Sequence, residues 1–468
     1  MDRYRFSDEA NMHYTFTDAD ALVSDTKYIL KFINHHMQHQ QPRLKTLEQY
    51  YLGNNTSIFD GARRREEHQA DHRAAHNFAK YVSDFQKGYL TGTPIKTNYT
   101  ADNDAVNDYL VDVNRLNNAD EHNAELVLSQ SKFGRAYELV YRTDTTKFVD
   151  LSPLTTFVIY SDDVERSPLA GIRYIKNKFA DKTIVTVYTA KEIITYETDI
   201  SVQSLRRIGA QVNHFGDVPI IEYENNRDRQ GDYEDVLSLI DLYDAAQSDT
   251  ANYMTDFNDA MLKVVGNMDI EEIVEMKKAN VIKLEPSYDE ISGREGRADA
   301  DYIYKKYDVA GTEAYKDRVF NDILFFTSVP NMNDENFSGT QSGVAMKYKL
   351  FALEQKRSTK ERSFIRSLRQ RYTLISNVAS AASESTIDVN DIEIVFTPNL
   401  PTDIKEEMEW FNSSGGRLSQ ETLLSQLTFI NNAREEQRKI DDESPQSIVS
   451  RDSFEFGYEE SFKVNEDE

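Results

Sequence analysis

The chain has 468 residues, of which 39% are hydrophobic, so it is long enough for about two to four domains with buried cores. It contains no cysteine, which excludes disulfides, thiolate zinc sites and thiol nucleophiles. Its net charge of −26 argues against tight, general phosphate binding, and no apolar run approaches the about 18 residues of a membrane-spanning helix.

The N-terminal part is predicted to be a flexible tail, residues 1–22, followed by helices. Residues 24–39 have apolar side chains at helical spacing, and Pro42 opens a second helix that ends at the Gly53 turn, so we expect two antiparallel helices. His68, His72 and His76 are spaced four apart, which would place them on one helical face. Such a row could bind zinc or nickel, but no carboxylate arrangement or familiar motif spacing supports a site, and we expect a polar interface face without metal.

Helices are predicted to give way to strands after Gly134. Residues 77–97 and 101–135 are mainly helical in pattern. Short β-branched or aromatic runs then follow at 137–141, 148–151, 156–160, 172–176, 184–188, 193–197 and 218–223. These runs predict a mostly antiparallel sheet.

A long helix with two unlike faces is predicted for residues 232–265. At about 100° per residue, its apolar side chains gather within roughly a third of the circumference, opposite a row of acids. That row is Asp241, Asp244, Asp249, Asp256 and Asp259. The acids could be a metal or catalytic group, but their even spread favours a solvated or channel-facing wall. The apolar face needs a partner, for which the helix predicted at 312–327 is the obvious candidate.

A small α/β module, residues 266–310, is predicted between these two helices. It would contain a short helix at 269–279 and strands at 281–284 and 302–307. Between the strands lies a mobile loop, 292–297, with Arg294, Glu295 and Arg297.

A polar break follows the second helix and separates it from a longer one. The break, residues 329–342, includes Asn331, Asn333, Asp334, Asn336, Phe337, Ser338 and Gly339. Past Ser342 and Gly343, about 40 residues without proline or glycine predict a helix of about 60 Å. Residues 345–372 have nine Lys or Arg against two Glu, which indicates either a solvated face or a surface facing acids of this chain or of neighbouring copies.

The C-terminal part is predicted to be a strand, then helices, then an acidic tail. The strand covers 392–396, the helices cover 402–441 with an interruption at Gly415 and Gly416, and residues 442–468 are expected to be disordered.

Motifs for nucleotide binding and hydrolysis are missing from the sequence. It has no Gly-x-x-x-x-Gly-Lys loop, Gly-x-Gly-x-x-Gly turn, His-Glu-x-x-His or Gly-x-Ser-x-Gly pattern. A nuclease or glycosidase carboxylate pair would not stand out among so many acids. We expect no enzymatic activity, no catalytic residues, no metal site and no cofactor.

Several stretches, in this order, resemble the portal proteins of tailed bacteriophages, specifically of long-tailed phages of Gram-positive hosts. They are YYLG at 50–53, HNFAKY at 76–81 with GYLTGTPI at 88–95, SKFGRAY at 131–137, PIIEYENN at 219–226, FSGTQSG at 337–343 and GRLSQET at 416–422. With the segments around and between them, the resemblance covers about residues 45–440, nearly the whole chain.

The resemblance implies an α+β portal fold and a ring, of twelve copies, at one capsid vertex, around a channel for DNA packaging and ejection. Residues 23–231 would form the wing, 232–265 and 311–328 the stem, 266–310 the clip, 329–342 the tunnel loop, 343–401 the long helix and strand of the wing, and 402–441 the crown. The tunnel loop would touch passing DNA, or else be a connection with no DNA role. An acidic stem would let DNA slide, because many phosphate contacts would hold it.

The resemblance also implies partners and a location. The partners are other copies of the chain, non-specifically contacted double-stranded DNA, the terminase large subunit, the major capsid and scaffolding proteins, and a head-completion adaptor, with no membrane. The clip loop would be a docking site, and the protein would lie in the virion and, during assembly, in the host cytoplasm. The alternatives are a DNA-processing enzyme such as a nuclease, or another capsid-associated protein without a central hole.

Overall fold

The computed structural model describes residues 6–60, 70–256, 261–265, 271, 274, 288–289, 294–295, 299–303, 308–332, 350–399, 404–414 and 418–443, apart from residues 102, 178, 200, 428–429 and 431–432. The predicted disordered tail therefore lies almost entirely outside the described residues. No helix in the described part of the chain combines the length and hydropathy that crossing a bilayer requires.

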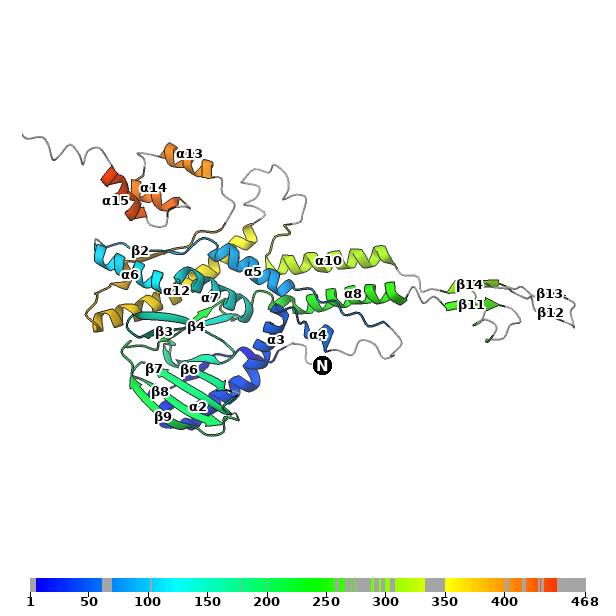
Figure 1. Ribbon diagram of the computed structural model, residues 1–468, viewed down its shortest axis with the longest axis horizontal. Helices are drawn as coiled ribbons and strands as arrows, with labels where there is room; N and C mark the ends of the chain where they lie inside the picture. The colour runs from blue at the N-terminus through cyan, green and yellow to red at the C-terminus, as the bar shows by residue number, and fades with distance from the viewer. Residues whose placement is uncertain are drawn as a thin grey trace, which may run out of the picture.

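Two sheets form the body of the molecule (Figure 1). The larger has the order β1-β5-β6-β7-β8-β9 and is antiparallel except where β1 pairs with β5. Its strands are β1 Tyr14–Phe16, β5 Thr156–Ser161, β6 Pro168–Asn177, β7 Lys182–Thr189, β8 Glu192–Asp199 and β9 Arg206–Val212. The smaller, of order β10-β3-β4, comprises β3 Arg135–Arg142, β4 Thr146–Leu151 and β10 Ile220–Glu224. The predicted antiparallel strands are confirmed, whereas β9, exposed along its whole length, was not predicted.

The predicted flexible tail is wrong from residue 6 onward. A short 3-10 helix, Asp8–Asn11, leads into β1, and Tyr14 pairs with Ile159 on β5. The Tyr14 ring is 3% exposed and meets Phe157 edge-on, with 5.0 Å between ring centroids. Burying this aromatic side chain at a sheet edge outweighs the polar composition around it.

The two helices predicted on either side of Pro42 are not antiparallel. Helix α2, Thr26–His35, continues through a π-helical turn, His36–Gln40, into α3, Gln41–Tyr51. The Gln41 N–H donates to the His36 carbonyl five residues earlier, as in a π-helix. Pro42, which has no backbone N–H to donate, directly follows this wider turn. A proline at the first turn of α3 starts a helix without reversing the chain.

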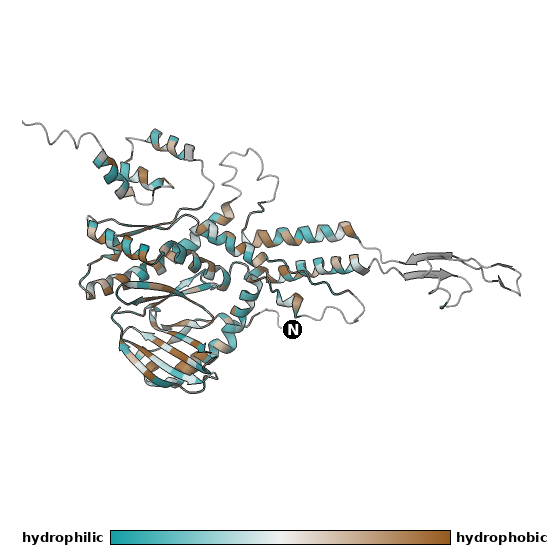
Figure 2. Ribbon diagram, viewed as in Figure 1, coloured by the Kyte–Doolittle hydropathy of each residue, from teal (hydrophilic) through white to brown (hydrophobic). Residues whose placement is uncertain are grey.

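Helices cover the sheets and enclose separate cores. The helices are α1 Ala19–Ser24, α4 Thr56–Phe59, α5 Phe78–Thr91, α6 Asp104–Leu116, α7 Ala119–Phe133 and α12 Phe351–Ala381. One core lies between the larger sheet and α2, and includes Ile33, Ile172 and Val187. A second joins α6, α7, the smaller sheet and α12, where Phe364 meets Tyr223 with 4.8 Å between ring centroids. The hydropathy pattern of Figure 2 alternates along the strands of the larger sheet, as expected for strands with unlike faces.

The C-terminal part follows the prediction closely. Strand β15, Ile392–Val395, pairs with β2, Lys96–Tyr99, after a 3-10 turn, Val389–Asp391. Helices α13 Ile404–Ser414, α14 Gln420–Gln426 and α15 Ala433–Glu443 then follow. Residues 415–417, where the interruption was predicted, lie outside the described residues.

Candidate functional site: a projecting helix pair and its anchor

Helices α8, Leu237–Asp256, and α10, Val309–Thr327, lie side by side and extend away from the body (Figure 1). A 3-10 turn, Glu234–Val236, leads into α8. Ile240 of α8 is buried in one cluster with Val319 and Ile323 of α10. Lys316 Nζ donates to Gln247 Oε1 at 2.8 Å across the same contact. The predicted pairing of these two helices is confirmed.

The predicted helix 232–265 is too long. Residues Met261–Val265 form strand β11, which pairs antiparallel with β14, Asp299–Ile303, so that Met261 faces Ile303 and Val265 faces Asp299. The segment ends in two valines, which favour strands, and its partner strand overrides the continuing helical pattern. The strand pair lies beyond the tips of α8 and α10.

The clip loop is also more regular than predicted where the structure describes it. Strand β13, Arg294–Glu295, pairs antiparallel with β12, Tyr288–Asp289. These two residues therefore belong to a hairpin rather than to a mobile loop. Arg297 and the predicted strand at 281–284 lie outside the described residues, as does most of the helix predicted at 269–279.

The predicted acidic wall of α8 is partly wrong. Asp244 is fully buried, and Asp241 is half-buried and accepts a hydrogen bond from Tyr50 Oη at 2.5 Å. Asp249 is exposed. Asp256 ends α8, and its side chain lies outside the described residues, as does Asp259. Helical periodicity placed Asp241 and Asp244 opposite the apolar face, but it could not reveal that another segment of the chain covers them.

The covering segment is an extended strap, residues 70–77, which runs along α8. The backbone N–H groups of His72, Ala74 and His76 donate to Asn252 Oδ1 at 2.6 Å, Ser248 Oγ at 3.0 Å and Asp244 Oδ1 at 2.9 Å. Four helical residues rise about 6 Å, and two extended residues span about 6.6 Å. The side chains at positions 244, 248 and 252 therefore form a ladder that satisfies alternate amides of the strap.

The histidine row does not form a helical face. Where it is described, it lies in the extended strap, and His68 lies outside the described residues. His76 Nδ1 lies 2.9 Å from Asp244 Oδ1, and His72 Nε2 lies 2.8 Å from Thr255 Oγ1. Hydrogen bonding to α8 held this segment extended, which the four-residue spacing could not predict.

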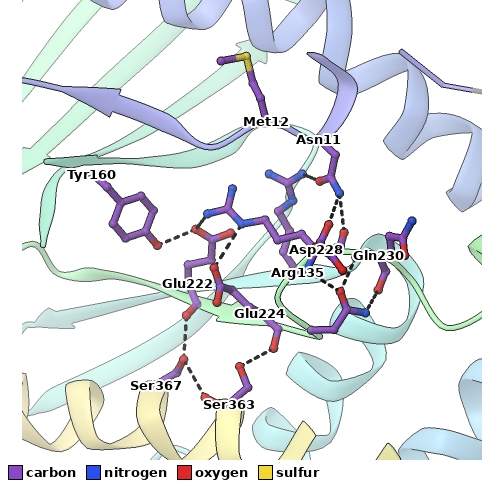
Figure 3. Close-up of polar contacts among 12 residues, drawn as sticks. Asn11, Met12, Arg135, Tyr160, Glu222, Glu224, Asp228, Gln230, Ser363 and Ser367 are labelled. Carbon is purple, nitrogen blue, oxygen red and sulfur yellow. Dashed lines mark hydrogen bonds and ion pairs between the residues drawn. The ribbon is translucent and has the colours of Figure 1, made fainter. Parts of the chain in front are cut away.

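A polar turn between β10 and α8 anchors the helix pair to the body (Figure 3). Arg229, in the left-handed region with φ of 54°, donates to Glu222 Oε2 at 2.9 Å. Tyr160 Oη donates to the same oxygen at 2.7 Å. From α12, Ser367 Oγ donates to the Glu222 carbonyl and Ser363 Oγ to the Glu224 carbonyl, each at 2.8 Å. Side chains of β5 and α12 thus hold strand β10 at the point where it leads into the turn.

The N-terminal segment and α7 close over this turn. Asn11 Nδ2 donates to the Asp228 carbonyl at 2.6 Å (Figure 3), and Arg43 donates to the Arg229 carbonyl at 3.0 Å. Gly134 has φ of 79°, and a Cβ built on it would lie 1.8 Å from the Arg229 carbonyl oxygen. The position therefore admits only glycine.

Buried ion pairs connect α12 to the anchor. Asp232 lies 3.1 Å from Lys356 Nζ and also contacts Lys360. Burial alone would raise the pKa of the Asp232 carboxyl, but the two lysines outweigh it and hold that pKa well below its usual range. Part of the basic excess predicted along this helix, Lys356, Lys360 and Arg371, therefore faces buried acids of the same chain, whereas Arg362, Arg366 and Arg369 are exposed.

Glu138 of β3 is the centre of a second buried charge group. Arg371 of α12 and His122 of α7 each approach it to 2.8 Å, and Tyr223 Oη donates to it at 2.6 Å. Burial favours the neutral acid, but Arg371 and then His122 outweigh it and lower the pKa of Glu138 to about 2. One carboxylate thus joins two strands and two helices.

The predicted tunnel loop begins beside exposed aromatic residues. Phe325 and Phe326 at the end of α10 are 76% and 63% exposed, and Phe351 at the start of α12 is 59% exposed. Asn331 is half-buried. The other residues predicted to touch DNA, Asn333, Asp334, Asn336, Phe337, Ser338 and Gly339, lie outside the described residues.

An open cleft of about 870 Å³ lies beside the anchor turn. Its lining mixes acids such as Glu165 and Glu224 with Arg166, Arg227 and Arg366. Because the lining carries both signs of charge, it gives no reason to assign the cleft a ligand of one charge.

Sequence reasoning missed both the anchor and the ladder. The motifs at 50–53, 76–81, 131–137 and 219–226 converge on them, although each motif was weak alone. The available signal for the ladder was the spacing of Asp244, Ser248 and Asn252, polar residues four apart on one side of the helix.

Comparison with known proteins gives a consistent match. A family model described as "Phage portal protein, SPP1 Gp6-like" matches residues 30–449. The portal protein of Bacillus phage SPP1 is 24% identical over 454 residues, covering 90% of this chain and 87% of that protein. The portal protein of Clostridium phage phiCD119 is 25% identical over 428 residues, covering 83% of this chain and 90% of that protein.

Solved structures also match the chain at low identity. A chain from the virion of a native gene transfer agent particle has a TM-score of 0.40 at 13% identity, covering 82% of this chain and 92% of that one. A chain from the neck of an empty gene transfer agent particle has a TM-score of 0.43 at 12% identity, covering 79% and 97%.

Proposed function

The chain belongs to the family of SPP1 Gp6-like phage portal proteins, and from this premise we propose how its elements build a portal. A portal protein is a structural virion protein that forms a homo-oligomeric ring at a capsid vertex, so the alternative of a nuclease is set aside. The match across residues 30–449 is the observation that carries this function.

The projecting helix pair is proposed to be the stem that surrounds the DNA channel, in a ring of twelve copies. The strand pairs β11–β14 and β12–β13 would form the clip, the two sheets with α12 the wing, and α13 to α15 the crown. The support is that α8 and α10 leave the body together and are joined through β11 and β14.

The acidic bore is reassigned on this proposal. Asp241 and Asp244 contact their own subunit, so they serve its structure rather than the channel. Exposed acids of the pair, Asp249, Glu313 and Asp317, are the candidates to face DNA. An anionic surface would keep DNA from binding tightly and stalling.

The tunnel loop, residues 329–342, is proposed to touch passing DNA. Deleting residues 333–338 should leave ring assembly intact and lower the amount of DNA packaged into heads, measured by quantitative gel analysis of nuclease-resistant DNA. A deletion of the same length within residues 444–468 is the matched control. Unchanged packaging in the loop variant, or loss of the ring, would refute the role.

The clip is proposed to dock the terminase large subunit outside the capsid and, after packaging, a head-completion adaptor. Arg294 and Arg297 are the candidate contacts. Reversing both charges should weaken terminase capture by purified rings, and undiminished capture would exclude them. The major capsid and scaffolding proteins are proposed partners of the wing, met in the host cytoplasm during assembly.

A further inference from the structure

Three candidate metal ligands meet where the N-terminal segment crosses the π-helical turn. Glu9 comes from the 3-10 helix Asp8–Asn11, His35 is the last residue of α2, and His39 lies in the turn His36–Gln40. Side chains four residues apart in a helix are neighbours on one face, a spacing at which two histidines can bind the same metal ion. Here the two imidazole rings are stacked with 4.5 Å between centroids.

The ligand atoms have the spacing of a metal site. Glu9 Oε2 lies 2.9 Å from His39 Nδ1 and 3.8 Å from His35 Nε2. All three groups offer a ligand atom within 4.8 Å of the others. Bonds of about 2.0–2.2 Å in a tetrahedral zinc site place ligand atoms about 3.3–3.5 Å apart, so small side-chain movements would complete the site.

The hydrogen bond to His35 supports a metal more than a simple Glu–His pair. Tyr14 Oη lies 3.0 Å from His35 Nδ1, which leaves Nε2 directed to Glu9 and His39. Metal-binding histidines typically have their second ring nitrogen held in this way. A Glu9–His39 pair alone would not require His35 to be fixed at its other nitrogen.

We propose that Glu9, His35 and His39 bind a zinc ion, with water at the fourth position. Two imidazoles and one carboxylate are a known zinc ligand set, and the chain has no thiolate to compete. The side chains of Glu9 and His39 are 57% and 36% exposed, so an ion can enter from solvent. The site differs from the histidine row in the strap, where the described histidines contact α8 instead.

Zinc there would stiffen the anchor of the projecting helix pair. Glu9 is two residues from Asn11, which holds the carbonyls of Asp228 and Arg229 in the turn before α8. The ion would tie the segment that carries Asn11 to the helix run α2–α3. We therefore expect zinc to stabilise the N-terminal segment without being needed for the chain to fold.

The test is zinc titration of the full chain, freed of metal with a chelator, by calorimetry and thermal unfolding. One ion per chain should bind and raise Tm, and Co²⁺ in its place should give the visible absorption of a site with nitrogen and oxygen ligands. His39→Ala should weaken zinc binding at least about 100-fold. Tyr14→Phe, which keeps the ring but removes the hydrogen bond to the ligand, should weaken it about 10- to 100-fold.

His72→Ala is the matched control, because it alters the other histidine row. Its zinc affinity should equal that of the parent chain. Equal affinity in His39→Ala and the parent, or loss of binding in His72→Ala alone, would overturn the proposal. If His39→Ala does not fold, Glu9→Gln, a substitution at an exposed side chain, replaces it in the test. A zinc affinity equal to that of the parent chain would then overturn the proposal.

Discussion

At the scale of single residues, the anchor depends on buried charges that are each matched. Asp232 with Lys360 and Glu138 with Arg371 join segments far apart in the sequence, and Glu222 with Arg229 holds the turn together locally. The sequence indicated a basic stretch at 345–372 but not its partners, because a chain with 80 acids offers many. Removing one member would leave the other charged and buried, which is costly.

Glu138→Gln should therefore destabilise the chain and flatten its pH profile. The pKa of Glu138 falls from 4.5 to about 2 on folding. Such a lowered pKa contributes about 3 kcal/mol above pH 5, which is lost as the pH falls toward 2. The stability gap between parent and variant, measured by urea unfolding, should be largest near pH 7 and narrow with acid. Glu121→Gln, at an exposed acid, is the control, and a gap that does not vary with pH would contradict this role.

Gly134→Ala should disturb the turn that sets the direction of α8. The left-handed backbone at Gly134 costs an alanine about 1–3 kcal/mol, and the contact with the Arg229 carbonyl adds to this. The matched control is Gly88→Ala, inside α5, where a Cβ meets nothing within 4 Å and should stabilise the helix by up to about 1 kcal/mol. Thermal unfolding should show Tm changes of opposite sign, and equal changes would refute the argument.

At the scale of elements, periodicity predicted which segments are helices and strands better than it predicted where they end or what they face. The strands after Gly134 and the α8–α10 pair followed from local pattern. The end of α8, the parallel strand β1 and the strap depend on partners distant in the sequence. Asp244, which was predicted to lie on the acidic wall of the helix, shows most clearly what periodicity does not predict, since its burial depends on contacts with residues 70–77.

The ladder on α8 should control the stability of the strap. Ser248→Ala combined with Asn252→Ala removes the acceptors for the amides of Ala74 and His72. Each lost hydrogen bond costs about 1 kcal/mol, so these amides should exchange hydrogen roughly tenfold faster by mass spectrometry. Ser238→Ala, at an exposed position on the same helix, should have no effect on the strap. Unchanged exchange at residues 72–76 in the double variant would mean that other contacts hold it.

At the scale of the whole molecule, one subunit is a body from which the α8–α10 pair projects as a rod, and its function requires a ring. Each short motif is weak alone, but their order along nearly the whole chain was sufficient to identify the family. The arrangement of subunits is not encoded in any one motif. Contacts at the anchor turn between segments far apart in the sequence hold the α8–α10 pair where it leaves the body.

Electron microscopy of the purified full chain with rotational averaging tests the central claim most directly. We predict rings with a central hole, in which the α8–α10 rods stand side by side around the hole. Single compact subunits under all assembly conditions, or rings that carry the rods on their outer rim, would contradict the account.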